Sequence, residues 1–202
     1  MYETALRRGF CIFILIVRGR PRSPAKIPIK RRDSPVNNII LIGMPGSGKS
    51  TIGVILAKEL GYHFTDTDIL IQQREERLLQ DIVDRDGVEA LLDAEERAIL
   101  GFSGRRTVVA TGGSAVFRAA SMAHLGDGGV IVYLRLPLAE ISRRIRNFST
   151  RGIACKKGTS LTDIYEERTP LYERYAEITV DCAGKSVEEN ADAIIAALGM
   201  RR

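Results

Sequence analysis

The sequence predicts an α/β fold, a three-layer sandwich with a central five-stranded parallel sheet. The first observation is that, from residue 37 onward, short apolar runs alternate with amphipathic stretches. This alternation is typical of parallel strands joined by crossover helices. The second is a glycine-rich stretch between the first apolar run and the first amphipathic stretch. Glycines at such a strand-to-helix turn predict a binding loop at one edge of the sheet.

The elements follow in order. We expect strands over the apolar runs at 38–43, 63–65, 106–110, 129–134 and 178–181. Helical spacing predicts helices over 50–60, 138–146, 161–175 and 187–198, and two more between 68 and about 100, broken near Asp86 and Gly87. Residues 147–159 are polar and predict a loop.

Charge divides the 202-residue chain into two parts, which we interpret as a tail, 1–36, and a domain, 37–200. The tail holds nine Lys or Arg against two Asp or Glu, and the rest of the chain holds 21 against 23. The tail is also Pro-rich, which predicts disorder. It is either dispensable or a contact for a membrane surface or an acidic partner. The nearly neutral domain argues against a nucleic-acid partner.

Composition excludes several other classes. The apolar run at 10–17 is too short to span a bilayer, so no membrane insertion is expected. Three cysteines without CxxC spacing and two histidines predict neither a disulfide framework nor a His/Cys metal site. Free cysteines favour the cytoplasm, and we expect a monomer because no long apolar stripe is exposed.

Residues 43–51 read GMPGSGKST and match the phosphate-binding pattern GxxxxGK[ST]. Glycines let main-chain amides converge on phosphate oxygens, Lys49 adds a cation, and the Ser50 hydroxyl can ligate Mg²⁺. The alternative is a glycine turn with a surface lysine. The pattern predicts a P-loop kinase type of fold that takes ATP and Mg²⁺, with the nucleotide held by Gly43, Gly46, Ser47, Gly48, Lys49, Ser50 and Thr51.

The class of P-loop protein is narrowed by what the sequence lacks. It contains no NKxD motif for reading guanine, which argues against a GTPase. No apolar run ending in Asp-Glu follows the loop, which argues against a motor-type ATPase. A chain this short has room for one nucleotide and one small acceptor, so we favour a small phosphotransferase.

Three further motifs follow the phosphate loop: FTDTD at 64–68, VVATGGS at 108–114 and ERTPLY at 167–172. Together the four motifs resemble the shikimate kinase family over residues 39–198. The resemblance implies ATP-dependent phosphorylation of a hydroxyl on a small carboxylate metabolite. The acceptor it implies is shikimate, converted to shikimate 3-phosphate in aromatic amino acid biosynthesis.

The resemblance also implies roles for two carboxylates and two glycines. Asp66 would orient Mg²⁺, and Asp68 would bind the acceptor hydroxyl and act as catalytic base. The alternative is that Asp66 or Thr67 caps the helix that begins near Asp68. Gly112 and Gly113 would let the acceptor lie against the backbone, and the alternative is a plain turn with Ser114 as N-cap.

Three arginines complete the implied site. Arg168 would hold the acceptor carboxylate with its planar fork, and the alternative is a surface ion pair with Asp163 or Glu167. Residues 147–159 match the family's lid, from which Arg151 would reach the transferring phosphate. Arg144 would stack on the adenine. A basic solvated segment is the alternative for Arg144 and Arg151.

One segment departs from the family pattern. Where the family has GExxFRxxE, residues 87–95 read GVEALLDAE, which puts Leu91 and Leu92 in place of the Phe and the acceptor-binding Arg. Losing such a pair costs about 10- to 150-fold in binding. Either Arg74, Arg77 or Arg85 substitutes for the missing arginine, or the acceptor is not shikimate. An amino acid such as homoserine, paired with Glu89 or Asp93, is one candidate acceptor. A further alternative is that the chain is an ATP-binding module without catalysis.

Overall fold

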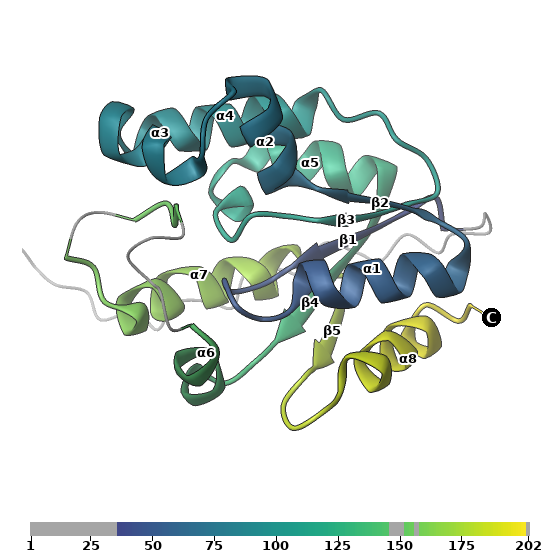
Figure 1. Ribbon diagram of the computed structural model, residues 1–202. Helices are drawn as coiled ribbons and strands as arrows, with labels where there is room; N and C mark the ends of the chain where they lie inside the picture. Colours follow the sequence, from purple (N-terminus) through teal and green to yellow (C-terminus); the bar gives the residue numbers. More distant parts are fainter. Residues whose placement is uncertain (1–35, 146–151, 156–157, 201–202) are drawn as a thin grey trace, which may run out of the picture.

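The computed structural model describes residues 36–145, 152–155 and 158–200. The predicted tail up to residue 35, Arg151 and much of the predicted lid lie outside these residues. The sheet has five parallel strands in the order β2-β3-β1-β4-β5 (Figure 1). These strands are β1 (Asn38–Ile42), β2 (His63–Asp66), β3 (Thr107–Ala110), β4 (Gly129–Arg135) and β5 (Ile178–Asp181). The predicted sheet is confirmed.

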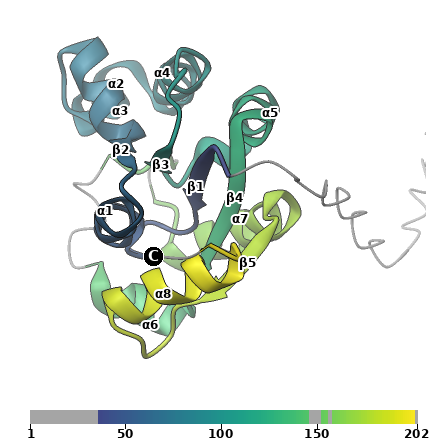
Figure 2. The same cartoon turned by 90° about the vertical axis from the view of Figure 1, so that its right-hand side faces the viewer.

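Helices cover both faces of this sheet, which confirms the three layers. Figure 2 shows α1 and α8 on one side and α4, α5 and α7 on the other. These helices are α1 (Lys49–Leu60), α4 (Val88–Leu100), α5 (Ala119–Gly128), α7 (Leu161–Tyr175) and α8 (Val187–Ala197). A sixth, α6 (Leu138–Arg144), follows β4. Because each crossover joins two parallel strands, the carboxyl ends of all five strands lie at one edge of the sheet.

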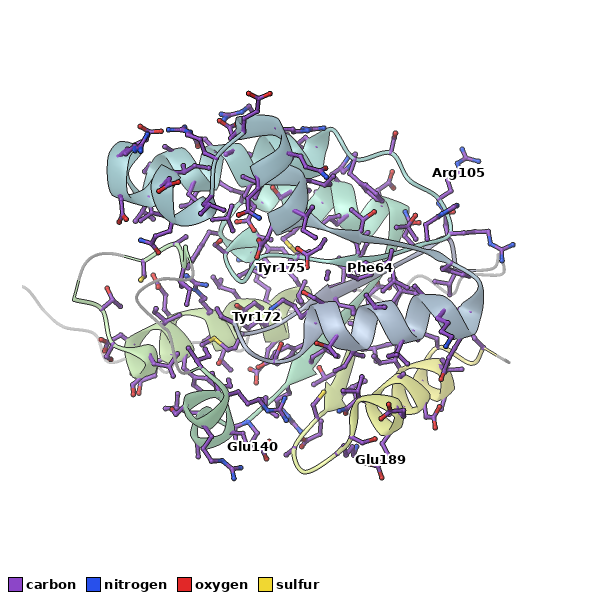
Figure 3. All side chains as sticks on the ribbon, viewed as in Figure 1. Phe64, Arg105, Glu140, Tyr172, Tyr175 and Glu189 are labelled. Atoms are coloured by element: carbon purple, nitrogen blue, oxygen red, sulfur yellow. The ribbon has the colours of Figure 1, made fainter. Side chains whose placement is uncertain are left out.

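The core forms around β1, the central strand. Ile39, Ile40, Leu41 and Ile42 are fully buried, because a central parallel strand is covered on both faces. The helices contribute Leu56, Ile164 and Ile194 to the same cluster. Figure 3 shows Tyr172 in the interior, whereas Arg105 and Glu189 lie at the surface.

The segment between residues 67 and 100 corrects one expectation. It holds three helices rather than two: α2 (Thr67–Glu75), α3 (Leu79–Asp86) and α4. The predicted break at Gly87 is present, with φ of 90°. The second break, at Glu76, has a left-handed φ of 52°, and no glycine or proline signals it. A short 3₁₀ turn, η1 (Ala115–Phe117), and α5 occupy a segment for which no element is predicted above.

Among the described residues, no helix has the length and apolar character needed to cross a membrane. The ends of β1, β2 and β3 lie side by side, followed by the phosphate-binding sequence, α2 and the two glycines after β3. Ligands of open α/β sheets bind at this carboxyl edge, beside the point where the strand order reverses.

Candidate functional site

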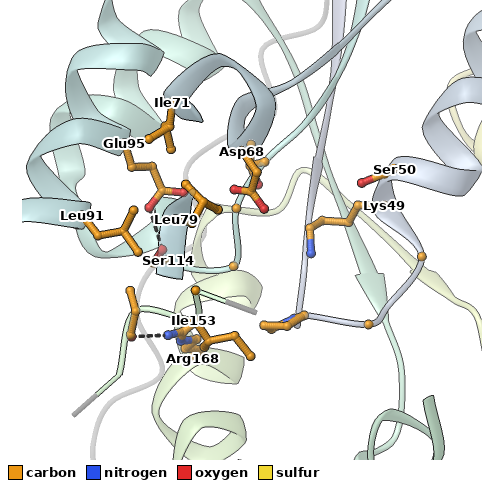
Figure 4. Close-up of a pocket in the computed structure, with 18 of the residues that line it drawn as sticks. Lys49, Ser50, Asp68, Ile71, Leu79, Leu91, Glu95, Ser114, Ile153 and Arg168 are labelled. Atoms are coloured by element: carbon orange, nitrogen blue, oxygen red, sulfur yellow. Dashed lines mark hydrogen bonds between the residues drawn. The ribbon is translucent and has the colours of Figure 1, made fainter. Parts of the chain in front are cut away.

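A cavity of about 510 Å³ opens at this edge (Figure 4). Its lining comes from the loop before α1, the first turn of α1, the helices α2, α3, α4, α6 and α7, the loop after β3 and residues 152–154. These elements are distant in sequence, so the cavity depends on the whole fold.

The loop between β1 and α1 forms one side of the cavity. Gly43, Gly46 and Gly48 have φ values of 145°, 79° and 96°, a region that favours glycine. The loop ends at the N-terminus of α1, where unpaired amides and the helix dipole attract anions. Ser47 is fully buried within the loop, and Thr51 lies exposed on the cavity wall. The backbone therefore has the form of a phosphate cradle.

Lys49 lies in the first turn of α1 and points into the cavity (Figure 4). Its Nζ donates to the carbonyl oxygens of Gly43 at 2.8 Å and Met44 at 2.9 Å. Burial lowers the pKa of this ammonium to about 8, and the nearby Asp68 and Asp66 carboxylates oppose that shift. The result is a cation held against the cradle, where a nucleotide phosphate would reach it.

Asp66 caps α2, as the alternative for it predicts, and it also bonds to Ser50. Its Oδ2 accepts a hydrogen bond from the Ser50 hydroxyl at 2.6 Å, and its Oδ1 accepts one from the Asp68 amide at 2.9 Å, which caps α2. A hydroxyl and a carboxylate suit Mg²⁺ that also binds phosphates and water. In the described parts of the chain, no cluster of three or more His, Cys, Asp or Glu could hold a metal without such help.

Asp68 lies in the first turn of α2 and faces Lys49 across the cavity (Figure 4). Burial is the main cause that raises the pKa of this carboxyl to about 6, and Asp66 adds to it, whereas Lys49 opposes it. The neighbouring Thr67 Oγ1 accepts a hydrogen bond from the Gly112 amide at 2.9 Å, which ties α2 to the loop after β3. A carboxylate with this pKa can accept a proton near neutral pH.

Gly112 and Gly113 form the floor of the cavity, and both positions require glycine. A Cβ at Gly112 would overlap the carboxylate oxygens of Glu95 and Asp68. A Cβ at Gly113 would come within 2.9 Å of Arg168 Nη1. Three charged side chains therefore approach the backbone of two adjacent residues.

Glu95, on α4, is a site residue that the sequence analysis missed. It is 3% exposed, and its Oε2 accepts a hydrogen bond from the Ser114 hydroxyl at 2.7 Å. Burial raises the pKa of this carboxyl to about 7. The signal that could have found it is the last Glu of the family pattern GExxFRxxE, which this chain keeps at position 95. Ser114 stands at the N-cap position of η1, as its predicted alternative has it, but its hydroxyl bonds to Glu95 and makes no side-chain cap.

Arg168, on α7, is 1% exposed, so the alternative of a surface ion pair is wrong. Its Nη2 donates to the Ala154 carbonyl at 2.6 Å, and the guanidinium lies 5.2 Å from the centre of the Phe117 ring. Tyr172, one helical turn later, donates to the Gly113 carbonyl at 2.6 Å. These contacts fix a guanidinium beside the glycine floor.

Arg144 is the remaining arginine at the cavity. It lines the wall beside the P-loop, and its Nη2 donates to Glu140 at 3.3 Å. Arg151 lies outside the described residues.

The structure answers the question of a substitute arginine. Leu91 lines the cavity, while Leu92 packs beside it in an apolar cluster with Ile71 and Ala154. Arg74 donates to the Arg97 carbonyl at 2.8 Å, and Arg77 pairs with Asp86 at 2.7 Å. Among the described residues, the cavity lining includes neither of them, nor Arg85.

The acidic partners considered for an amino-acid acceptor are also wrong. Glu89 and Asp93 each accept a hydrogen bond from Arg118 at 2.6 Å on the outer surface of α4. Glu95, on the same helix, faces the cavity instead.

Comparison with known proteins gives the family. A family model described as shikimate kinase matches residues 45–199. The chain belongs to the shikimate kinase family. A protein named shikimate kinase from Paracidovorax citrulli is 40% identical over 152 residues, which cover 72% of this chain and 82% of that protein.

Two further relatives show the range of the family. Human threonine synthase-like 1 is 36% identical over 168 residues, which cover 80% of this chain but 22% of the human protein. Among solved structures, shikimate kinase from Acinetobacter baumannii in complex with shikimate superimposes with a TM-score of 0.74 at 27% identity, covering 81% of this chain and 93% of that one. The fold and family are shared with proteins of quite different total length.

Proposed function

We propose that the protein transfers the γ-phosphoryl group of Mg·ATP to a hydroxyl group of a small acceptor that carries a carboxylate. The observation that carries this proposal is the placement of Lys49 and Asp68 on opposite sides of one cavity, with the Ser50–Asp66 pair between their elements. Membership in a phosphotransferase family supports it.

The chemistry follows from these groups. Asp68 accepts the proton of the acceptor hydroxyl while the acceptor oxygen bonds to the γ-phosphorus and the bond to the oxygen of ADP breaks. The products are ADP and a phosphate monoester. Lys49 and the amides of the P-loop stabilise negative charge on the phosphoryl oxygens. The Asp68 pKa of about 6 leaves this carboxylate mostly ionised at neutral pH.

Ser50 and Asp66 would hold Mg²⁺, which neutralises charge on the β- and γ-phosphates when bound. Gly43, Gly46, Ser47, Gly48 and Thr51 would shape the nucleotide cradle. Arg144 lines the wall beside this cradle, where the adenine would lie. Arg151 remains the proposed lid cation from the sequence.

The acceptor would lie on Gly112 and Gly113, with its carboxylate on Arg168. Shikimate, converted to shikimate 3-phosphate, is the acceptor that the family resemblance favours. The missing cation at Leu92 keeps other hydroxylated acids and amino acids such as homoserine in the same class. We expect the reaction to take place in the cytoplasm, where ATP is available.

A coupled assay of ADP release tests the proposal. Shikimate, homoserine, gluconate and a nucleoside monophosphate serve as acceptors, and Lys49→Ala serves as the inactive control. We expect at least one acceptor to stimulate ADP release well above the rate with ATP alone. If no hydroxylated acid or amino acid does so, the protein is a nucleotide-binding module without phosphotransfer.

A further inference from the structure

Glu95 has an oxygen that the proposed reaction leaves unused. Its Oε2 bonds to Ser114, but its Oε1 is buried and has no hydrogen-bond partner. Figure 4 shows this carboxylate facing the cavity, on the same side as Asp68. A buried oxygen without a partner is costly, because it has lost its water and gained nothing in exchange. Its position at a cavity suggests that a ligand supplies the donor.

The acceptor half of the cavity holds more acidic than basic side chains. Asp68 and Glu95 are acidic there, and Arg168 supplies a guanidinium. The remaining wall is apolar and consists of Ile71, Leu79, Leu91 and Ile153. An acceptor with only a carboxylate satisfies Arg168 but brings a further negative charge toward Glu95. An acceptor that also carries an ammonium group satisfies both side chains.

The spacing of these groups limits the acceptor further. Glu95 Oε1 lies against Gly112, and Arg168 Nη1 lies against Gly113. Adjacent Cα atoms are about 3.8 Å apart, so the two charges flank neighbouring points of the floor. The ammonium and the carboxylate of an α-amino acid, which share one carbon, would lie over these two neighbouring points. Asp68, which also approaches Gly112, remains available for the hydroxyl.

We infer that the acceptor is a zwitterionic hydroxy amino acid, with its ammonium group on Glu95 and its carboxylate on Arg168. This inference rests on the proposed function for the transfer step, but the binding it describes is measurable without turnover. Glu95 is then a residue that determines acceptor specificity. The site keeps the Glu that ends the family pattern, as Glu95, but has Leu92 in place of the arginine three residues earlier, so this carboxylate is left for an amine.

Titration calorimetry on the full chain with Mg·ADP tests the inference. The probes are two pairs that differ only in the α-ammonium: homoserine against 4-hydroxybutyrate, and serine against 3-hydroxypropanoate. Shikimate is the reference. We expect the better amino acid to bind at least about 10-fold more tightly than its partner and more tightly than shikimate. Equal affinity within a pair, or tighter binding of shikimate or of a deaminated probe, overturns the inference.

Glu95→Gln removes the charge and keeps the shape. We expect it to weaken binding of the preferred amino acid at least about 10-fold and to leave the affinity of the deaminated probe nearly unchanged. Asp93→Asn is the matched control, since Asp93 lies on the same helix but bonds to Arg118 outside the cavity. Equal weakening of both probes in Glu95→Gln assigns Glu95 a structural role and overturns the inference.

Ser114→Ala keeps the Glu95 carboxylate and removes its hydrogen bond, so it should retain the preference for the amino acid. A loss of preference in that variant alone would contradict a direct contact with Glu95. Turnover is read separately. If the amino acid binds with the expected preference but is not phosphorylated, the proposed function fails while the acceptor class stands.

Discussion

The two halves of the cavity are built in different ways. The nucleotide half comes from one short stretch of chain, residues 43–51, and depends on backbone amides, glycine dihedrals and one helix terminus. The acceptor half comes from side chains on α2, α4 and α7, which the fold brings together around two glycines. Backbone chemistry can be recognised in a local sequence, whereas side-chain chemistry depends on tertiary packing.

The largest effect is expected in the nucleotide half. Lys49→Ala should lower kcat on the order of 10³-fold, because it removes the cation that stabilises the transferring phosphoryl group. Steady-state ADP release measures kcat, and circular dichroism checks that the variant is folded. Substantial turnover in a folded variant would remove Lys49 from the reaction.

Asp68 lies where the two halves meet. Asp68→Asn should lower kcat about 100-fold, because the amide cannot accept the hydroxyl proton. Its backbone amide still bonds to Asp66, so the cap of α2 is preserved. Affinity for Mg·ATP, measured by calorimetry, should change little. An unchanged kcat would show that Asp68 positions the acceptor without accepting its proton.

This contrast also explains what the sequence could predict. The five strands and the P-loop were predicted because buried apolar runs and a glycine-rich turn are local signals. The extra break at Glu76 carries no such signal. Glu95 and the buried Arg168 were missed or left open because a charged residue on a helix usually faces solvent. The side chains of Glu95 and Arg168 face inward only because α4 and α7 pack against the loop after β3.

Leu92→Arg should sharpen the difference in the acceptor half. A guanidinium at position 92, behind the wall residue Leu91, should increase the affinity for shikimate by roughly 10-fold or more, and leave the KM for ATP unchanged. Leu92→Met is the matched control, because it keeps an apolar side chain of similar volume. Competition binding measures both variants, and thermal unfolding reports the stability lost by placing a charge beside Ile71 and Ala154. No gain for shikimate in a folded variant would show that the apolar wall does not set acceptor choice.

Ser50→Ala tests the metal side of the nucleotide half. Loss of the hydroxyl that bonds Asp66 should raise the Mg²⁺ concentration needed for half-maximal rate about 10-fold. A titration of rate against free Mg²⁺ at fixed ATP measures this. An unchanged Mg²⁺ requirement would separate the Ser50–Asp66 pair from metal binding.

The smallest effect concerns stability. Because the folded-state pKa of Glu95, about 7, lies above its ordinary value of 4.5, the folded protein binds more protons than the unfolded chain between these pH values. Stability from this group is therefore present at low pH and is lost as pH rises toward 7. We therefore compare the Tm of Glu95→Gln with that of the wild type. The difference between them should shift by about 5 °C in favour of the variant as the pH rises from 5 to 8. A relative loss over that range would contradict the buried carboxylate.

The central claim is that one cavity joins a phosphate cradle to a carboxylate that accepts a hydroxyl proton. Phosphorus NMR of the full chain with Mg·ATP and its best acceptor tests this most directly. We predict a phosphate monoester resonance that grows in equal amount with ADP and is absent with Lys49→Ala. ADP accompanied only by inorganic phosphate, with every hydroxylated acid and amino acid tested, would contradict the account.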